Sequence, residues 1–505
     1  MTAISTAVGL ERRSRVSGYR ISKGFFNDTT TNLPQIIAVF GEANDANQGT
    51  LSTVKKEVTS AQEAGELYGF GSPIHQMMRI LRPVNSAGVA GIPTVVFPQE
   101  SDAGATATII GWTVTGTATS NATHTVVING RDGLDFQNYS FSIVLGDTPT
   151  LIAAKIADAV NGVLGSPVSA VAAVGVVTFT TKWKGLTSAK TNINIDNLSV
   201  NAGISYSETT NTAGAGDVVL TTSFAQFGTE WYTTVINPYA TKLDEFEQFN
   251  GVPYGASPTG RYNAIEFLPF TAFFGSVESD KDNLVAITNA AARVDQLTNV
   301  LCPAPNSLGF DWEAAANMVA LFSRIAQDTP QLTVSNLAYA DMPSPSDAII
   351  GDMSDYNNRD FLVKKGCSTV TLANGAYKVQ DLVTTYHPEG EIPLQYAYPR
   401  NLNIDWNVKD GYGILETQNV KDHVIIADSQ VSDAQRTIKP RQWAAVLYDY
   451  FESLAERALI REPEFSKESL LVQRGVTNPD RFETFFRYRR TGIARIQSTD
   501  AEAGF

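Results

Sequence analysis

Short apolar runs separated by helical patterns open the chain and predict alternating strands and helices. Continuous apolar stretches at 35–40 and 94–97 are typical of buried strands. Between them, Ser60 begins a capping-box pattern that predicts a helix ending at Gly69, and Ser72-Pro73 predicts the start of a second helix. Elements in this order favour an α/β fold with a mainly parallel sheet.

Residues 109–216 show a different pattern, rich in Thr, Gly, Ala, Ser and Val. Only 11 of these 108 residues are charged, against 18% in the whole chain. Alternating apolar and polar positions predict three strands, at 123–128, 139–145 and 174–180. Thr148-Pro149 predicts the start of one helix among them. We interpret the stretch as a compact β-rich insertion, with Gly214–Gly216 as a hinge back to the α/β part.

Residues 217–361 return to the α/β pattern. The expected elements are strands at 231–236 and 264–270 and helices at 242–251 and 284–294. Asp311 is expected to cap a longer helix with one apolar face, formed by Trp312, Ala315, Val319, Phe322 and Ala326.

The last third of the chain, 362–505, is predicted to be less regular. A strand at 377–385 is followed by a long polar crossing to a strand at 422–427. The clearest helical pattern then covers 441–460, with an aromatic and aliphatic stripe of Trp443, Val446, Tyr450, Leu454 and Ala458. Such a stripe usually packs into a core, although an aromatic one also suits an interface.

Charge and cysteine content restrict the class of protein. The net charge of −14 argues against general binding of nucleic acids or of anionic membranes. The two cysteines, Cys302 and Cys367, lie in apolar surroundings, which predicts buried thiols in a reducing compartment. The N-terminal residues do not resemble a signal peptide, and no apolar stretch suits a membrane helix. We therefore expect synthesis in the cytoplasm and no membrane insertion.

Motifs that would carry chemistry are not found. The sequence contains no Gly-Lys-Ser or Gly-Lys-Thr phosphate loop, no Cys-x-x-Cys and no His-Glu-x-x-His. Ser257 resembles a nucleophile elbow only superficially, and His387 before Pro388 is expected to be a loop residue. We therefore predict no catalytic, cofactor-binding or metal-binding residue and no cofactor.

Several segments, in order, resemble contractile bacteriophage tail sheath proteins of the Mu-type branch. The segments are the strand-and-proline motif at 231–239, the Ala-rich helix at 314–325 leading to Asp328-Thr329-Pro330 and a strand at 332–337, then 379–386, and late in the chain 476–481. The end of the β-rich stretch, 177–185, resembles the outer domain of that branch. The resemblance covers nearly the whole chain.

The resemblance implies a multi-domain α/β fold with an inserted β-rich, β-sandwich-like outer domain and extended terminal strands. The expected domains are an N-terminal linking arm, 1–30, joined with an inner C-terminal domain, 362–505; a middle α/β domain from 31–108 and 217–361; and the outer domain, 109–216. No enzymatic activity is implied.

The function implied by the resemblance is mechanical. A tail sheath subunit forms hexameric rings that stack into a helix around the tail tube protein, with baseplate and tail terminator proteins at the ends. Contraction then drives the tube through the host envelope during genome ejection. The resemblance implies a location in the virion tail, after assembly in the host bacterial cytoplasm, and no nucleic-acid partner.

The two ends of the chain are the candidate linking elements, because both are extended and basic. Strands contributed by the arms would add to sheets of neighbouring subunits through main-chain hydrogen bonds. The candidate linking residues are Val16, Tyr19, Arg20, Ile21, Arg487, Tyr488, Arg489, Ile493 and Ile496. The candidates for contact with the tube are Lys439, Arg441, Trp443 and Tyr450.

Two alternatives remain open from the sequence. The Thr- and Gly-rich stretch would also suit a baseplate component or adhesin that binds a surface glycan. A subtilisin-like hydrolase is a weaker alternative, because no serine-protease signature surrounds His75 or His387. An adhesin would form trimers or small complexes, whereas a sheath subunit would form long tubes.

Overall fold

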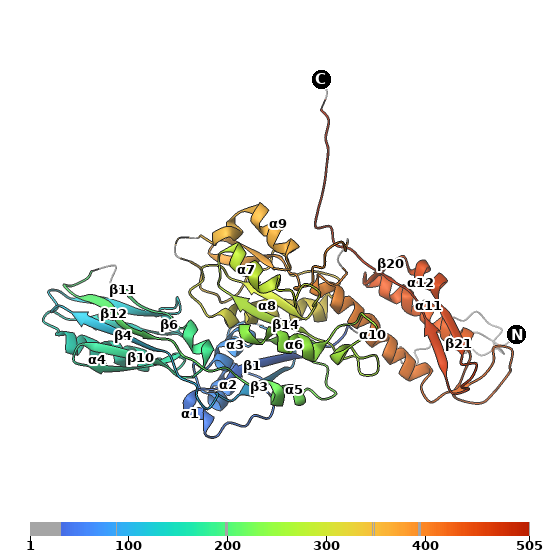
Figure 1. Cartoon of the computed structure of the whole chain (residues 1–505), viewed down its shortest axis with the longest axis horizontal. Helices are drawn as coiled ribbons and strands as arrows, with labels where there is room; N and C mark the ends of the chain where they lie inside the picture. The colour runs from blue at the N-terminus through green and yellow to red at the C-terminus, as the bar shows by residue number, and fades with distance from the viewer. Residues whose placement is uncertain are drawn as a thin grey trace, which may run out of the picture.

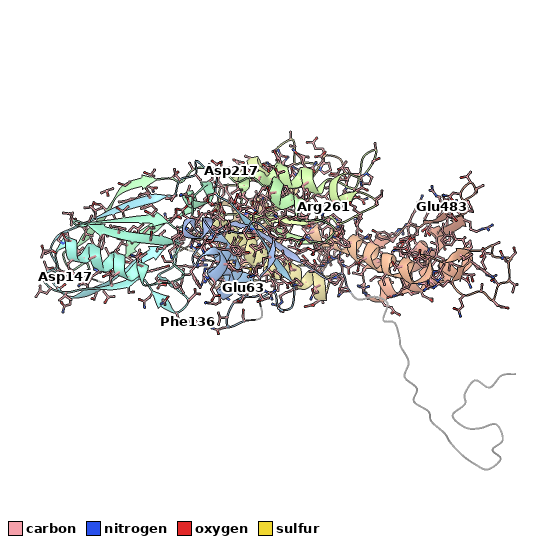
Figure 2. The ribbon with its side chains drawn as sticks, turned by 90° about the horizontal axis from the view of Figure 1, so that it is seen from below. Glu63, Phe136, Asp147, Asp217, Arg261 and Glu483 are labelled. Carbon is pink, nitrogen blue, oxygen red and sulfur yellow. The ribbon has the colours of Figure 1, made fainter. Side chains whose placement is uncertain are left out.

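The structure is a computed structural model that describes residues 32–503 except 87, 197–199, 346, 348 and 392–394. The molecule is elongated. The 109–216 stretch forms one end, an α/β body lies in the middle, and the C-terminal helices and hairpins form the other end (Figure 1). Asp147 of the inserted stretch and Glu483 near the C-terminus accordingly lie at opposite ends of the molecule (Figure 2).

A six-stranded sheet forms the centre of the body, in the order β15-β14-β13-β1-β3-β2. The strands are β1 (Ile37–Glu42), β2 (Lys56–Glu57), β3 (Thr94–Gln99), β13 (Thr234–Ile236), β14 (Thr271–Ser276) and β15 (Asn299–Pro303). All neighbours are parallel except β2, which is antiparallel to β3. The apolar runs are continuous because helices cover both faces of a parallel sheet.

Side chains alternate between two cores on the two faces of this sheet. Ile37 and Val39 of β1 join the core that holds α3 (Pro73–Leu81) and α8 (Asp311–Asp328). Ala38 and Phe40 join the opposite core, where aromatic residues around α5 (Thr221–Ala225) and α6 (Leu243–Asn250) pack. The predicted α/β fold class is confirmed.

The body contains further helices, a hairpin and short 3-10 turns. They are α1 (Asp45–Gln48), α2 (Ala61–Tyr68), α7 (Lys281–Thr288), α9 (Tyr356–Lys364), the hairpin β16 (Thr369–Ala373) and β17 (Ala376–Asp381), and the 3-10 turns η2 (Ala240–Lys242), η3 (Gly260–Tyr262) and η4 (Gly351–Ser354). The helix caps predicted at Ser60 and Ser72 are present, with hydroxyls accepting from Glu63 N at 3.1 Å and His75 N at 3.2 Å.

The 109–216 stretch contains two antiparallel sheets and a helix around a core of its own. One sheet has the order β12-β4-β10-β9 and the other β11-β5-β8, with a small hairpin β6-β7 beside them. The strands are β4 (Ile109–Thr115), β5 (Ala122–Ile128), β6 (Gly133–Leu134), β7 (Gln137–Asn138), β8 (Ser140–Ile143), β9 (Val168–Ala173), β10 (Val176–Thr181), β11 (Ile193–Asp196) and β12 (Ser205–Thr212). Helix α4 (Pro149–Asn161) is capped by Thr148, as the sequence predicts.

The junction of this stretch with the body is tightly bonded. Thr106 N donates to Ala215 O at 2.8 Å, so the entering and leaving segments pair with each other. A Cβ added at Gly214 would lie 1.9 Å from Ser188 Oγ. The glycines predicted as a hinge are thus required by close packing, and this packing favours a fixed junction.

The C-terminal region is built on two long helices. Helix α10 (Pro399–Asn419) leads away from the body, and α11 (Pro440–Glu456) packs beside it. The smaller elements are α12 (Pro463–Ser469) and the strands β18 (Val424–Ile425), β19 (Thr437–Ile438), β20 (Ile460–Arg461), β21 (Leu471–Arg474), β22 (Phe482–Phe485) and β23 (Arg489–Arg490). Their three sheets are two-stranded: β18-β19, β20-β23 and β21-β22.

Several sequence predictions about these elements are wrong. The strand expected at 264–270 lies instead at β14, after Pro269, because proline has no N–H to donate to a ladder. The strand expected at 332–337 is a turn, and Asp311 lies inside the first turn of α8, whose N-cap is Phe310. The polar crossing expected before 422 is helix α10, and strand β15 has no counterpart among the predicted elements.

The domain limits deduced from the sequence stay a prediction. One of them, at 362, crosses a continuous core, because Leu362, Val370 and Tyr377 pack in the same cluster as Phe273 of the central sheet. This packing favours a C-terminal region that begins near α10.

Candidate functional site

In a doubly wound sheet, ligands bind outside the carboxyl ends of the strands where the strand order reverses. Here that point lies between β1 and β13, because β3 continues from β1 on one side and β14 from β13 on the other. The space is filled by the chain itself. Thr187 of η1 (Leu186–Lys190), in the inserted stretch, donates to Glu42 Oε1 at 2.6 Å, and Tyr239 donates to Glu42 Oε2 at 3.0 Å.

Glu42 is a buried carboxyl at the end of β1, with 1% of its surface exposed. Burial raises its pKa to about 7, the hydrogen bonds from Thr187 and Tyr239 oppose the rise, and the nearby Asp217 adds to it. Trp183, fully buried beside Phe310 and Trp312, closes the same space. The position that holds ligands in many α/β proteins is thus used to fasten the inserted stretch to the body.

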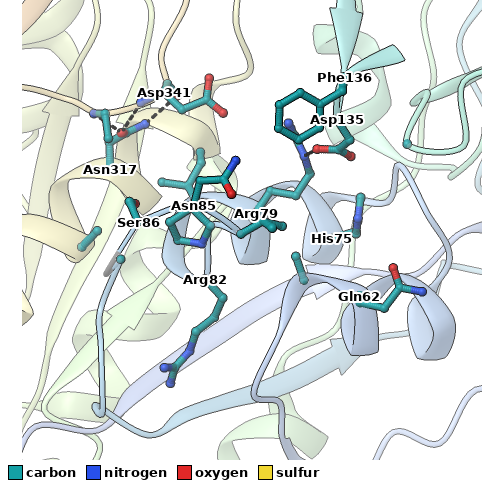
Figure 3. Close-up of a pocket in the computed structure, with 18 of the residues that line it drawn as sticks. Gln62, His75, Arg79, Arg82, Asn85, Ser86, Asp135, Phe136, Asn317 and Asp341 are labelled. Atoms are coloured by element: carbon teal, nitrogen blue, oxygen red, sulfur yellow. Dashed lines mark hydrogen bonds and ion pairs between the residues drawn. The ribbon is translucent and has the colours of Figure 1, made fainter.

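A cavity of about 640 Å³ lies where the β6-β7 hairpin approaches α3 and α8 (Figure 3). Across this cavity, Arg79 Nε forms an ion pair with Asp135 Oδ1 at 2.9 Å. His75 Nδ1 accepts a hydrogen bond from Gly71 N at 3.1 Å, and burial lowers the pKa of His75 to about 4. A neutral, hydrogen-bonded imidazole and an ion pair hold the wall of this cavity together, and no nucleophile is bonded to either group among the described residues.

The other residues considered for chemistry either make hydrogen bonds that hold the fold together or lie exposed without a catalytic partner among the described residues. His387 Nδ1 lies 2.6 Å from Thr385 O, and Nε2 lies 2.8 Å from the Asn289 side chain. Ser257 is exposed in a loop and bonds to no histidine in the part of the chain that is described. Cys302 and Cys367 are buried and free, as predicted.

Searches for two further kinds of site give negative results within the described ranges. No group of three or more His, Cys, Asp or Glu side chains is placed to hold a metal ion. No helix there has the length and apolar character needed to cross a bilayer.

The C-terminal region presents a different kind of surface. Strands β21 and β22 form an antiparallel hairpin with no third strand among the described residues, so each leaves one edge unpaired. The hairpin is held from one side only: Trp443 of α11 donates to Thr484 Oγ1 at 3.1 Å. Leu471 and Phe485 are 66% and 51% exposed. An exposed two-stranded sheet leaves N–H and C=O groups unpaired along its edges, to which a further strand can add.

The segment after this hairpin is anchored on its own chain by backbone bonds as far as Thr491 and by the Arg495 side chain, which lies 3.3 Å from Asp381. β23 pairs with β20, and Thr491 N donates to Leu459 O at 3.1 Å. Asp405 of α10 accepts from Tyr488 at 2.7 Å and from Arg490 at 2.6 and 2.5 Å. Of the candidate linking residues, Arg487, Tyr488 and Arg489 therefore lie in the anchor and not in a free arm.

Residues 492–503, here called the arm, have no regular pairing and lead away from the body (Figure 1). Ile496 in the arm is 92% exposed. Ile493 lies at its base, half-buried. The N-terminal candidates Val16, Tyr19, Arg20 and Ile21 lie outside the described residues.

The four candidates for contact with a tube divide into two groups. Trp443 and Tyr450 are 1% and 3% exposed and belong to the core between α10 and α11. Their expected role at a surface is wrong, because an aromatic stripe of this kind packs inside the chain. Arg441 is exposed and Lys439 half-buried, so both cations can be reached by a partner.

Sequence reasoning missed the β21-β22 hairpin. The signal is present in the alternation of Leu471-Val472-Gln473-Arg474 and Phe482-Glu483-Thr484-Phe485 around Asn478-Pro479, a strand–turn–strand pattern. The described part of the chain has a filled ligand crevice, an open sheet edge and an extended C-terminal segment, and these features suit a protein that assembles with other copies.

Comparison with known proteins shows what the chain is similar to. No family model matches the chain. The Mu-like prophage FluMu tail sheath protein of Haemophilus influenzae is 25% identical over 436 residues, which are 84% of each chain. The sheath tail protein of Desulfitobacterium hafniense has a TM-score of 0.44 at 11% identity, over 94% of this chain and 100% of that one. The sheath tail protein of Listeria innocua has a TM-score of 0.45 at 11% identity, over 92% and 94%.

The sequence relationship carries the conclusion. It confirms the predicted resemblance: the chain is similar in sequence to a Mu-like tail sheath protein. A structural role is favoured over the adhesin and hydrolase alternatives, since the related protein is a structural component of a tail.

Proposed function

We propose that the chain is the sheath subunit of a contractile tail, located in the virion tail and assembled in the bacterial cytoplasm. Copies of it form hexameric rings that stack helically around a tail tube protein, with baseplate and terminator proteins at the two ends. Contraction of the lattice drives the tube through the host envelope during genome delivery. The related sheath protein supports this class of function.

One observation carries the assembly mechanism: the chain holds both an unpaired sheet edge and an extended, unpaired arm. A two-stranded sheet is marginally stable by itself, and addition of a strand satisfies its free N–H and C=O groups. Because the arm lies outside its own fold, it is available to the β21-β22 hairpin of another copy. Repetition of this head-to-tail contact without closure produces a helical polymer.

Main-chain linkage explains how a lattice can change shape without coming apart. Hydrogen bonds of an added strand do not depend on which side chains meet. Subunits can therefore move as rigid bodies from a metastable extended lattice to a contracted one while the arms stay bound. The chain itself needs no catalytic activity, because the work comes from the difference in free energy between the two lattices.

The N-terminal residues 15–22 and the tube contacts belong to the same proposal. Residues 15–22 would supply a second linking strand, and deletion of 1–25 would then leave a folded chain that does not polymerise. Lys439 and Arg441 would meet acidic groups of the tube through weak, screened pairs that release during contraction. Charge reversal of both residues to Glu is expected to impair assembly on tubes.

The arm is tested by removing its N–H donors. The double variant Ile493→Pro and Ile496→Pro cannot pair fully as an added strand, because proline donates no hydrogen bond. We expect it to fold and to remain monomeric where the wild-type chain forms tubes in negative-stain images. The matched control, Ile493→Ala and Ile496→Ala, keeps every N–H and is expected to form tubes. Normal tubes from the proline variant would contradict strand addition by the arm.

A further inference from the structure

Five arginines line one cavity at the point where the arm leaves the body. The cavity has a volume of about 530 Å³, and its arginines come from α10, β20, β23 and the base of the arm: Arg400, Arg461, Arg489, Arg490 and Arg495. We call this the arginine cavity. The chain as a whole carries a net charge of −14, so this concentration of cations is opposite to the rest of the molecule.

The carboxylates around the arginine cavity do not balance its charge. Asp405 binds Arg490 through both oxygens, and Asp381 lies 3.3 Å from Arg495. Glu462 serves two arginines, as it pairs with Arg489 and lies 3.8 Å from Arg461. Three carboxylates therefore face five guanidinium groups, which leaves an excess of two positive charges.

Arg400 is the cation with no carboxylate partner in the described part of the chain. It is 6% exposed, and its guanidinium donates to Gln331 O, Thr491 O and Thr491 Oγ1 at 2.7, 2.7 and 2.8 Å. Burial, with Arg495 and Arg490 nearby, lowers the pKa of Arg400 to about 10. Crowded cations in a partly dry site attract an anion, because its charge relieves their repulsion.

Guanidinium groups recognise carboxylates and phosphates, since their N–H donors match two oxygens at once. The arm carries two carboxylates, Asp500 and Glu502, which are exposed and pair with no cation of the described residues. The two charges equal the excess in the cavity. In Figure 1 the C-terminal segment leads away from the body, so its carboxylates are available to another molecule.

The length of the arm fits contact with a second copy. Arg495 is still held on the body, 3.3 Å from Asp381, so the four residues from 496 to 499 span roughly 13 Å at about 3.3 Å per residue if extended. The acidic residues that follow are thus carried beyond the body.

We propose that the arginine cavity of one subunit binds the acidic end of the arm, residues 498–503, of a second copy. This inference rests on the proposed function, because it gives the arm a second contact after the added strand. Strand addition supplies the backbone linkage, and the arginine–carboxylate contact fixes which residues of the arm reach the neighbour. Part of the lattice cohesion is then electrostatic and weakens as salt screens it.

The test is a charge exchange in the full chain. One variant reverses the arm, with Asp500→Arg and Glu502→Arg, and another reverses the rim of the cavity, with Arg461→Glu and Arg489→Glu. We expect each to raise the protein concentration needed for polymerisation by roughly tenfold, as for the loss of close charge pairs at an interface. The variant that combines all four changes is expected to regain polymerisation.

Controls separate this contact from general charge effects. Asp433→Arg with Glu389→Arg, and Lys421→Glu with Arg436→Glu, make the same charge changes at exposed positions outside the cavity. These controls are expected to polymerise like the wild-type chain. Arg461 has 61% of its side chain exposed, so Arg461→Glu alone serves if the double rim variant does not fold. Unchanged polymerisation of the arm variant, or failure of the four-fold variant to recover, would overturn the inference.

A binding assay on the full chain keeps this inference distinct from the proposed function. A labelled peptide with the sequence of 494–503 is expected to bind the unpolymerised protein in a salt-dependent manner. Binding should be lost with Arg461→Glu and with a peptide that carries Asn and Gln at the two acidic positions. Equal binding in these cases would overturn the inference. Absence of polymers from the wild-type chain would instead count against the proposed function.

Discussion

The two ends of the molecule differ in how their sheets are built. The inserted stretch closes two sheets and α4 around 23 buried apolar residues, and this core includes no residue from outside 110–204. The C-terminal region has a core of two helices, and its three sheets have two strands each. The first end has an apolar core of its own inside sheets of three and four strands, although in the described part of the chain the outer strands of these sheets also leave one edge unpaired. The second leaves sheet edges and an arm unsatisfied, which suits a region that is completed by other copies.

The largest expected effects come from the two cores. Trp443→Ala in the C-terminal core and Phe179→Ala in the inserted stretch each remove an aromatic ring that is 1% exposed. Each is expected to destabilise its own end by about 4 kcal/mol. Hydrogen exchange of peptides from the two ends measures where the loss occurs. Only Trp443→Ala should also impair polymerisation, and loss of polymers with Phe179→Ala alone would contradict the comparison.

The junction between the inserted stretch and the body is expected to depend on pH. The pKa of Glu42 rises from 4.5 to about 7 on folding, so its protonated form is favoured in the folded chain. The stability from this group is complete below pH 4.5 and is lost as the pH rises towards 7, a difference of about 3 kcal/mol. Glu42→Gln should flatten this dependence.

Urea unfolding between pH 4.5 and pH 8 measures the effect of Glu42→Gln. The matched control is Glu247→Gln, because burial also raises the pKa of Glu247 to about 7 but its partners, Asn299 and Arg293, lie within the body. The pH dependence of hydrogen exchange around Thr187 should be weaker in Glu42→Gln than in the wild-type chain. In Glu247→Gln it should be the same as in the wild-type chain. The same response in both variants would show that Glu42 does not fasten the junction.

The smallest effects on folding are expected at exposed apolar residues. Phe485 on the hairpin and Val171 on β9 are 51% and 68% exposed, so truncation of either to Ala should change the stability of the monomer by less than about 0.5 kcal/mol. Phe485→Ala should nevertheless slow polymerisation, measured by light scattering, whereas Val171→Ala should not. Equal rates would remove the distinction between the two surfaces.

Local signals in the sequence predict well where the structure uses local rules. Caps at Ser60, Ser72 and Thr148 begin helices because the hydroxyl satisfies N–H groups three residues away. Helix α10 was not predictable in this way. It is buried on several sides, with Asn403 and Asn407 inside hydrogen-bonded to neighbours, so its apolar residues do not mark one face.

The candidate site shows the same limit. The sequence indicates an extended basic end but not where its anchor stops, because the partners of Tyr488 and Arg490 are on Asp405, more than 80 residues earlier. The arginine cavity combines residues from 395 to 495 and has no local motif. Burial of Trp443 and Tyr450 likewise depends on α10, whose course the polar pattern conceals.

Cross-linking between copies tests strand addition by the arm most directly. Ile496→Cys and Phe485→Cys variants, mixed before polymerisation and treated with a short bis-maleimide, place one thiol on the arm and one on the hairpin. The native Cys302 and Cys367 are fully buried and do not compete. The account predicts covalent dimers that form only between the two variants and only in the polymer. Polymers that form normally without such dimers would contradict it.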